Sequence, residues 1–169
     1  NKLRIMRASR YRLISIDAET GEPVKSFGDN GIVDTSKDLS WPIDPSQFEI
    51  NAAPTIYKDL VILGSAIGDN LLFRKTPPGD VRAYNARTGK LVWRWSNIPQ
   101  SPTDLGADTW IDGTWRDAGQ IETWPGVTVD EARGLVYLPT GNPGQLYYGG
   151  ARPGNNLFAE TLIALDAAT

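Results

Sequence analysis

The sequence predicts an all-β chain, because one strand-turn-strand unit recurs along it and no amphipathic helix longer than a turn or two is evident. In the best copy, residues 79–93, apolar residues alternate with polar ones on both sides of a Thr-Gly turn. A weaker copy occupies residues 13–24, and a shorter one occupies residues 162–169. Gly suits the positive φ of a tight turn, and the Asp or Asn before it can accept hydrogen bonds from turn amides.

The spacing between the copies exceeds the roughly 40 to 50 residues of the commonest propeller repeats, which predicts long loops. The closing Trp93 of the best copy is expected to cover a neighbouring sheet. Strands are expected at about 3–7, 11–17, 22–27, 53–57, 60–65, 80–85, 90–96, 124–129, 134–139 and 160–166, with long loops at 28–50 and 97–121.

Grouped into four-stranded antiparallel sheets, these segments predict a partial β-propeller of about two and a half blades. Residues 1–169 then belong to a single propeller domain. Part of one blade spans 1–50, a complete blade spans 51–97, and part of a third spans 122–169, after a long loop at 98–121. Because blades bury their faces against neighbours, and about three or more repeats are needed for stability, we expect a longer parent polypeptide.

Composition narrows the chemistry that this chain can perform. The net charge is −3 and the basic residues are scattered, which argues against nucleic acid as a partner. The chain has no Cys and no His, so disulfides, thiolates and imidazole bases are absent from it. No apolar run approaches the roughly 18 residues of a membrane span. Any chemistry must therefore use carboxylates, amides or a bound cofactor.

Several motifs, in the same order over nearly the whole chain, resemble the pyrroloquinoline quinone (PQQ) dependent dehydrogenases. The stretches Ser-Ala-Ile-Gly-Asp-Asn (65–70) and Tyr-Gly-Gly-Ala-Arg-Pro-Gly (148–154) are most similar to the glucose and polyol dehydrogenase branch. The resemblance implies an eight-bladed quinoprotein propeller with PQQ and a divalent cation, calcium or magnesium, on its axis. The motifs that carry it are residues 12–23, 26–31, 61–70, 77–82, 108–110, 135–143 and 148–160.

The resemblance assigns two cation ligands, Asp69 and Asn142. Both follow the second strand of successive blades, so they should meet near the axis. Hard cations prefer such oxygen ligands. Each residue could instead have a purely structural role in a turn, because Asp69 precedes Asn70 at a strand end and Asn142 precedes a Pro at another.

The resemblance also places the cofactor contacts. Trp124 falls where relatives lay a tryptophan against the planar quinone, and a broad indole face suits that stacking. Ala66 and Gly68 should line the cofactor edge with backbone, although many relatives have Ser at the position of Ala66. Asn51 replaces the Ser or Thr that binds a cofactor carboxylate in relatives.

Glu122 departs from the family, which has a neutral Thr or Asn near this position. A carboxylate facing the quinone's own carboxylates would repel them. Three explanations stay open: Glu122 points away, helps to hold the cation, or marks a site that no longer binds PQQ.

The implied reaction is oxidation of a sugar, polyol or alcohol by hydride transfer to the quinone, with electrons passed on to a quinone or cytochrome acceptor. No catalytic base can be named in these residues, so the segment alone is expected to be inactive. The rest of the propeller is an expected partner, and the expected location is periplasmic, with any membrane association through other parts of the protein. The alternative is a propeller that keeps the repeat as a binding or assembly scaffold without the quinone, as in the outer-membrane assembly lipoprotein family.

Overall fold

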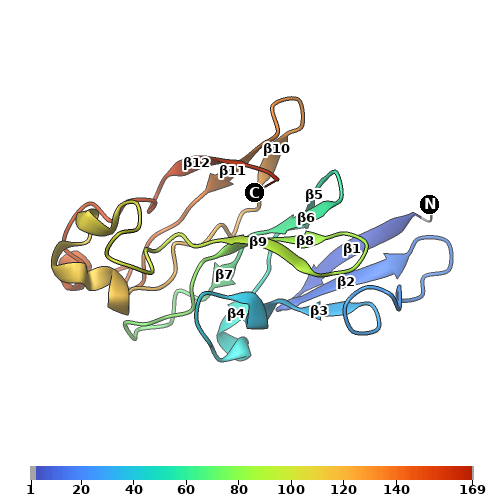
Figure 1. Cartoon of the computed structure of the whole chain (residues 1–169). Coiled ribbons are helices and arrows are strands. Elements are labelled where there is room, and N and C mark those ends of the chain that lie inside the picture. Colours follow the sequence, from blue (N-terminus) through green and yellow to red (C-terminus); the bar gives the residue numbers. More distant parts are fainter. Residues whose placement is uncertain (1–2, 169) are drawn as a thin grey trace.

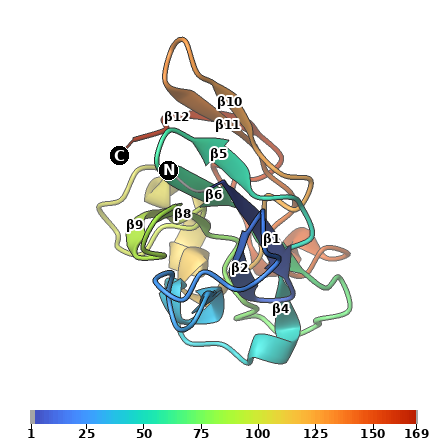
Figure 2. The same cartoon turned by 90° about the vertical axis from the view of Figure 1, so that its right-hand side faces the viewer.

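The computed structural model describes residues 3–168, in which three larger antiparallel sheets follow one another along the chain. The middle sheet lies between the other two, as Figure 1 and Figure 2 show. The first sheet contains β1 (Arg4–Ser9), β2 (Arg12–Asp17) and β3 (Ile32–Asp34). The middle sheet contains β5 (Thr55–Tyr57), β6 (Leu60–Leu63), β8 (Val81–Asn85) and β9 (Leu91–Trp95), and the third contains β10 (Thr128–Asp130), β11 (Leu135–Pro139) and β12 (Leu162–Asp166).

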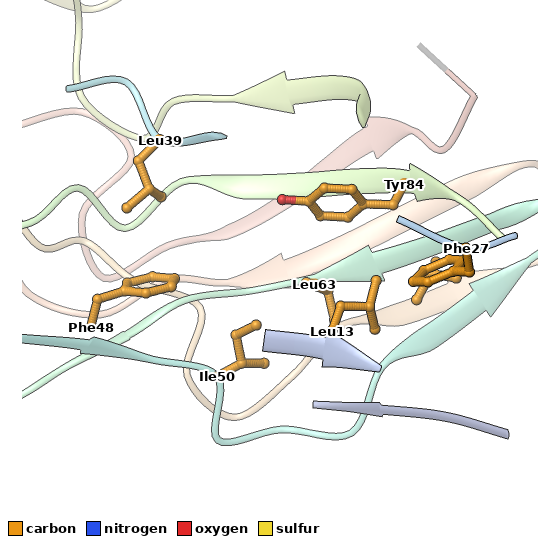
Figure 3. Close-up of a cluster of buried hydrophobic side chains, with 8 residues drawn as sticks. Leu13, Phe27, Leu39, Phe48, Ile50, Leu63 and Tyr84 are labelled. Carbon is orange, nitrogen blue, oxygen red and sulfur yellow. The ribbon is translucent and has the colours of Figure 1, made fainter. Parts of the chain in front are cut away.

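The middle sheet is buried on both faces. Successive strand residues point to opposite faces of a sheet, and β6 is apolar on both. Val61 and Leu63 pack toward the first sheet, where Figure 3 shows Leu63 beside Leu13, in the same cluster as Phe27. Ile62, between them, packs toward Val136 of the third sheet. The sheets therefore stack face to face, as blades of a propeller do.

The predicted strand 22–27 is wrong. Pro23 makes only a single bridge to Ile16, and residues 25–28 turn so that Phe27 is fully buried. Proline has no N–H for the ladder, which limits pairing here. The rest of the edge of β2 is covered by β3, which lies inside the loop predicted at 28–50.

The two predicted long loops contain more structure than expected. In the first, β4 (Phe48–Glu49) pairs with β7 (Ala66–Ile67), and the short 3₁₀ helices η1 (Thr35–Asp38) and η2 (Pro45–Gln47) precede it. The second contains η3 (Ala107–Thr109) and η4 (Ile111–Asp117), and η5 (Gly149–Ala151) follows β11. The predicted strand 124–129 begins only at Thr128, and β6 ends at Leu63. Within residues 3–168, no helix has the length and apolar character to cross a membrane.

The predicted repeat turns are confirmed. Asn85 Oδ1 accepts hydrogen bonds from the backbone N–H of Arg87 and Thr88, both at 2.9 Å, and Asp17 Oδ1 makes the equivalent contacts. Asp166 Oδ1 accepts from Ala168 N at 2.8 Å, and the last residue of that copy, Thr169, lies outside the described residues.

The predicted covering role of Trp93 is also confirmed. Its indole Nε1 donates to the carbonyl oxygen of Ala167 at 3.2 Å, and its ring packs on the cluster between the middle and third sheets. The repeat therefore stacks adjacent sheets.

Candidate cofactor and cation site

Residues 119–124, here called the floor segment, run between the middle and third sheets. On one side, Gly79 N donates to the carbonyl oxygen of Gln120 at 2.9 Å. On the other side, Gly141 N donates to the carbonyl oxygen of Glu122, also at 2.9 Å. The floor segment thus joins the connection that precedes β8 to the one that follows β11.

Buried Asn97 reinforces this joint. Its side-chain amide donates to the carbonyl oxygen of Gly79 at 3.1 Å and also to that of Ile121. A buried polar group that bonds two backbone carbonyls satisfies acceptors that would otherwise lack partners. Asn97 therefore fixes the separation between the floor segment and the start of β8.

Two glycines let the floor segment lie directly on the middle sheet. A Cβ at Gly64 would stand 2.1 Å from the carbonyl oxygen of Thr123, and a Cβ at Gly79 would stand 2.5 Å from Glu122 Cα. Any larger residue would displace backbone at both points. The end of β6 and the start of β8 therefore set the position of Glu122.

The backbone entering Glu122 adopts an uncommon conformation. Gln120 and Ile121 have φ values of 61° and 57°, which are left-handed, and both side chains are buried. Such a φ is unusual for a β-branched residue, and strained residues of this kind cluster at functional sites. The structure holds this turn with the hydrogen bonds on both sides of the floor segment.

Glu122 is one of the two carboxylates that the described residues bury, the other being Asp80. Its side chain is 7% exposed, and Oε2 has no hydrogen-bond partner within residues 3–168. Burial, and secondarily the negative charge of Asp69, raise the pKa of Glu122 to about 7 from its ordinary value of 4.5.

The proposed cation ligands both adjoin the floor segment. Asp69 is exposed and follows Gly68, whose carbonyl oxygen accepts from Gln120 Nε2 at 3.4 Å. Asn142 has an exposed side chain, and its carbonyl oxygen accepts from Ile121 N at 2.9 Å. No cluster of three or more His, Cys, Asp or Glu residues able to hold a metal occurs in the described part of the chain. A cation here would need the amide oxygen of Asn142 in addition to carboxylates.

Trp124 has the free indole face that stacking requires. It is 56% exposed, whereas the other five tryptophans are buried or half-buried. An added Cβ on Gly141 would lie 4.0 Å from Trp124 Cδ1 and 4.0 Å from Glu122 Cδ, so these three residues are neighbours. The position predicted for cofactor stacking thus presents an apolar plane next to a buried carboxylate.

The remaining residues predicted for the site do not line one common pocket. Ala66 is buried in β7, and with Gly68 it lines an open groove of about 720 Å³. Asp69 lines a different pocket of about 190 Å³, and Asn51 is exposed and lines neither. The residues predicted for the site therefore line separate open surfaces of the described chain.

Sequence reasoning missed the residues that build the joint. Gln120, Asn97 and the close-approach glycines carry no motif, because their role depends on contacts distant in sequence. The one available signal was Pro77-Pro78-Gly79, a rigid turn followed by a residue that allows close backbone approach.

The stacked antiparallel sheets and the joint between them define a segment of a β-propeller. The family model described as the glucose/ethanol/alcohol dehydrogenase β-propeller domain, a PQQ family, matches residues 1–169, and the chain belongs to that family. This confirms the predicted family and the all-β partial propeller.

Individual relatives agree with this assignment. The chain is 33% identical over 159 residues to the glycerol dehydrogenase large subunit of Gluconobacter oxydans, covering 94% of this chain and 21% of that protein. It is 33% identical over 159 residues to the quinate/shikimate dehydrogenase (quinone) of Acinetobacter baylyi, covering 94% of this chain and 19% of that protein. The crystal structure of quinohemoprotein alcohol dehydrogenase from Comamonas testosteroni superposes with a TM-score of 0.78 at 26% identity, covering 98% of this chain and 24% of that one. The chain spans about a fifth of the length of the curated relatives it matches.

Proposed function

We propose that this chain supplies part of the cofactor and cation site of a quinoprotein dehydrogenase that oxidises a sugar, polyol or alcohol. The observation that carries the proposal is the exposed indole of Trp124 beside Glu122, on the same segment that binds the backbone of Asn142 and Gly68. A flat apolar plane next to oxygen ligands suits a planar quinone that shares a cation with the protein.

The residues present fit both PQQ and a divalent cation. Trp124 would hold the flat face of the quinone, with the backbone of Ala66 and Gly68 and the amide of Asn51 as further contacts. Asp69 and Asn142 would offer hard oxygen ligands to calcium or magnesium. When bound, PQQ accepts the electrons removed from the substrate hydroxyl. The unpartnered Oε2 of Glu122 also fits a site that receives a positive charge.

We infer that the complete activity requires a longer protein, because this chain spans about a fifth of the length of the curated relatives it matches. The names of two relatives, lupanine 17-hydroxylase [cytochrome c] and quinate/shikimate dehydrogenase (quinone), support a cytochrome or quinone as the electron acceptor. The periplasmic location implied by the sequence resemblance stays a prediction.

The test is reconstitution of the full-length protein with PQQ and CaCl2, followed by reduction of an artificial electron acceptor. A panel of sugars, polyols and simple alcohols would define the substrate class. The expected result is cofactor-dependent absorbance and turnover with at least one class. Absence of both would contradict the enzyme and favour the scaffold alternative.

A further inference from the structure

Neither Glu122 nor Asp69 has a basic partner in the described part of the chain. The negative charge of Asp69 acts on Glu122, yet neither residue forms an ion pair with Lys or Arg in residues 3–168. A buried carboxylate without a compensating charge is costly, because its hydration is lost and not replaced.

The other buried carboxylate of the described residues shows how this chain normally compensates such a charge. Asp80 Oδ2 accepts from Ser40 N at 2.6 Å and lies 4.0 Å from Arg94 Nε. Asp80 therefore has both a hydrogen-bond donor and a cation beside it. Glu122 is also buried, but within residues 3–168 it forms no ion pair and its Oε2 accepts no hydrogen bond.

The surroundings of Glu122 supply further oxygen atoms and space. Gly141, which has no side chain, faces Glu122 Cδ, and Asn142 follows it with an exposed amide. The backbone of Asn142 is bonded to Ile121, the residue before Glu122. The carboxylate of Glu122 thus lies beside the strand end that carries Asn142, and Asp69 follows Gly68, which is hydrogen-bonded to the same floor segment.

On this geometry we propose that Glu122 is a third protein ligand of the cation site, which lets Asp69, Asn142 and Glu122 hold a divalent cation before the quinone binds. Two carboxylates give the site a charge of −2, which offsets the charge of calcium or magnesium. The cation also separates Glu122 from the carboxylates of PQQ, so the departure from the neutral residue of relatives is compatible with cofactor binding. This inference rests on the proposed function, since it names a further ligand of the same site.

The experiment is calorimetric titration of the full-length protein, freed of PQQ and divalent metal by a chelator, with CaCl2 at pH 8. The wild type is expected to bind calcium without PQQ, and Glu122→Gln is expected to weaken binding by about 10- to 100-fold. Glu122→Asp, which keeps the charge, should retain more of the affinity than Glu122→Gln. The matched control is Glu131→Gln, which removes the same charge at the exposed turn after β10 and should leave binding unchanged.

Equal calcium affinity in the wild type and Glu122→Gln would overturn the inference, as would a wild type that binds calcium only after PQQ is added. A second readout is the apparent unfolding temperature: calcium should raise it in the wild type and raise it less in Glu122→Gln. A parallel arm adds PQQ and substrate. If the wild type turns over and Glu122→Gln binds calcium with unchanged affinity, the inference about Glu122 is wrong and the proposed function stands. If the wild type binds neither calcium nor PQQ, the proposed function fails as well.

Discussion

Arg82 Nη2 donates a hydrogen bond to the carbonyl oxygen of Gly64 at 3.0 Å, which fixes a fully buried guanidinium to the end of β6. The same nitrogen donates to Ser65 Oγ at 2.9 Å, and Nη1 donates to the carbonyl oxygen of Thr35 at 2.9 Å. The guanidinium also lies over the ring of Phe48, 4.9 Å from its centroid. Arg82 thus connects the loop of the first sheet to the strand end that leads to Asp69.

Replacing Arg82 with Met should destabilise the protein and disorder the proposed cofactor site. Buried acceptors left without donors cost about 1–3 kcal/mol each. Arg82→Lys should recover little, because an ammonium lacks the planar fork that reaches three acceptors. Thermal unfolding of the full-length protein would measure this as a lower apparent unfolding temperature. Arg87→Met, which removes an exposed ion pair with Asp59, should change it little, and an equal effect of both variants would contradict the role of Arg82.

Trp124→Ala should weaken PQQ retention by about tenfold, because a stacked aromatic pair contributes about 0.5–1.5 kcal/mol beyond the area it buries. The apo-protein should lose little stability, since the indole is already exposed. Equilibrium dialysis of PQQ, together with thermal unfolding, separates the two effects. Trp110→Ala is the control: it empties a buried position and should destabilise the protein with or without cofactor. Unchanged PQQ binding by Trp124→Ala would remove this residue from the site.

Gly64→Ala should displace the floor segment, because the added Cβ would stand 2.1 Å from the carbonyl oxygen of Thr123. We expect weaker PQQ binding and a lower apparent unfolding temperature. Gly149→Ala introduces the same methyl group where nothing lies within 4 Å and should be silent in both measurements. Normal PQQ binding by Gly64→Ala would mean that the floor segment does not depend on this close approach.

Asp69→Asn should weaken the dependence of activity on calcium, because a neutral amide replaces a charged oxygen ligand. The measurement is turnover of the reconstituted full-length protein across calcium concentrations. We expect half-saturation to move to about tenfold higher calcium or more. Asp59→Asn is the control, as it removes an exposed carboxylate of the middle sheet. An identical calcium dependence in Asp69→Asn and the wild type would exclude Asp69 as a ligand.

The raised pKa of Glu122 predicts a pH dependence of stability without divalent cations. The folded state keeps the proton up to about pH 7, whereas the unfolded chain loses it near 4.5. The contribution of protonated Glu122 to the free energy of unfolding is therefore complete below pH 4.5. It is lost as the pH rises through about 7, and the loss is about 3 kcal/mol at most. Apparent unfolding temperatures of the chelator-treated protein should fall over this range. Glu122→Gln should flatten that part of the profile, and a profile unchanged by the substitution would contradict the assignment.

The local elements of the fold could be predicted because their signals are local. Asn85 and Gly89 predict the turn between β8 and β9, and the alternation of apolar and polar residues predicts the strands beside it. The pairing of β4 with β7 could not be predicted, because each strand has only two residues and no periodicity. Pro23 explains why an apparently continuous strand is replaced by a bridge and β3.

For the candidate site, the sequence proposes residues and not their geometry. The motifs point to Trp124, Asp69 and Asn142, whose roles stay predictions. The left-handed backbone of Gln120 and Ile121 could not be predicted from the residue types, because neither is Gly or Asn. Nor does Gly64 differ in the sequence from any other strand-end glycine, although it alone meets the carbonyl oxygen of Thr123.

The floor segment determines how the middle and third sheets can separate. Its backbone is hydrogen-bonded to both the connection before β8 and the connection after β11, so the middle and third sheets cannot separate without breaking it. A cofactor that binds the residues of this segment binds only the closed arrangement of the two sheets. Occupancy of the site should therefore protect the connections on either side from proteases, and loss of the cofactor should expose them first.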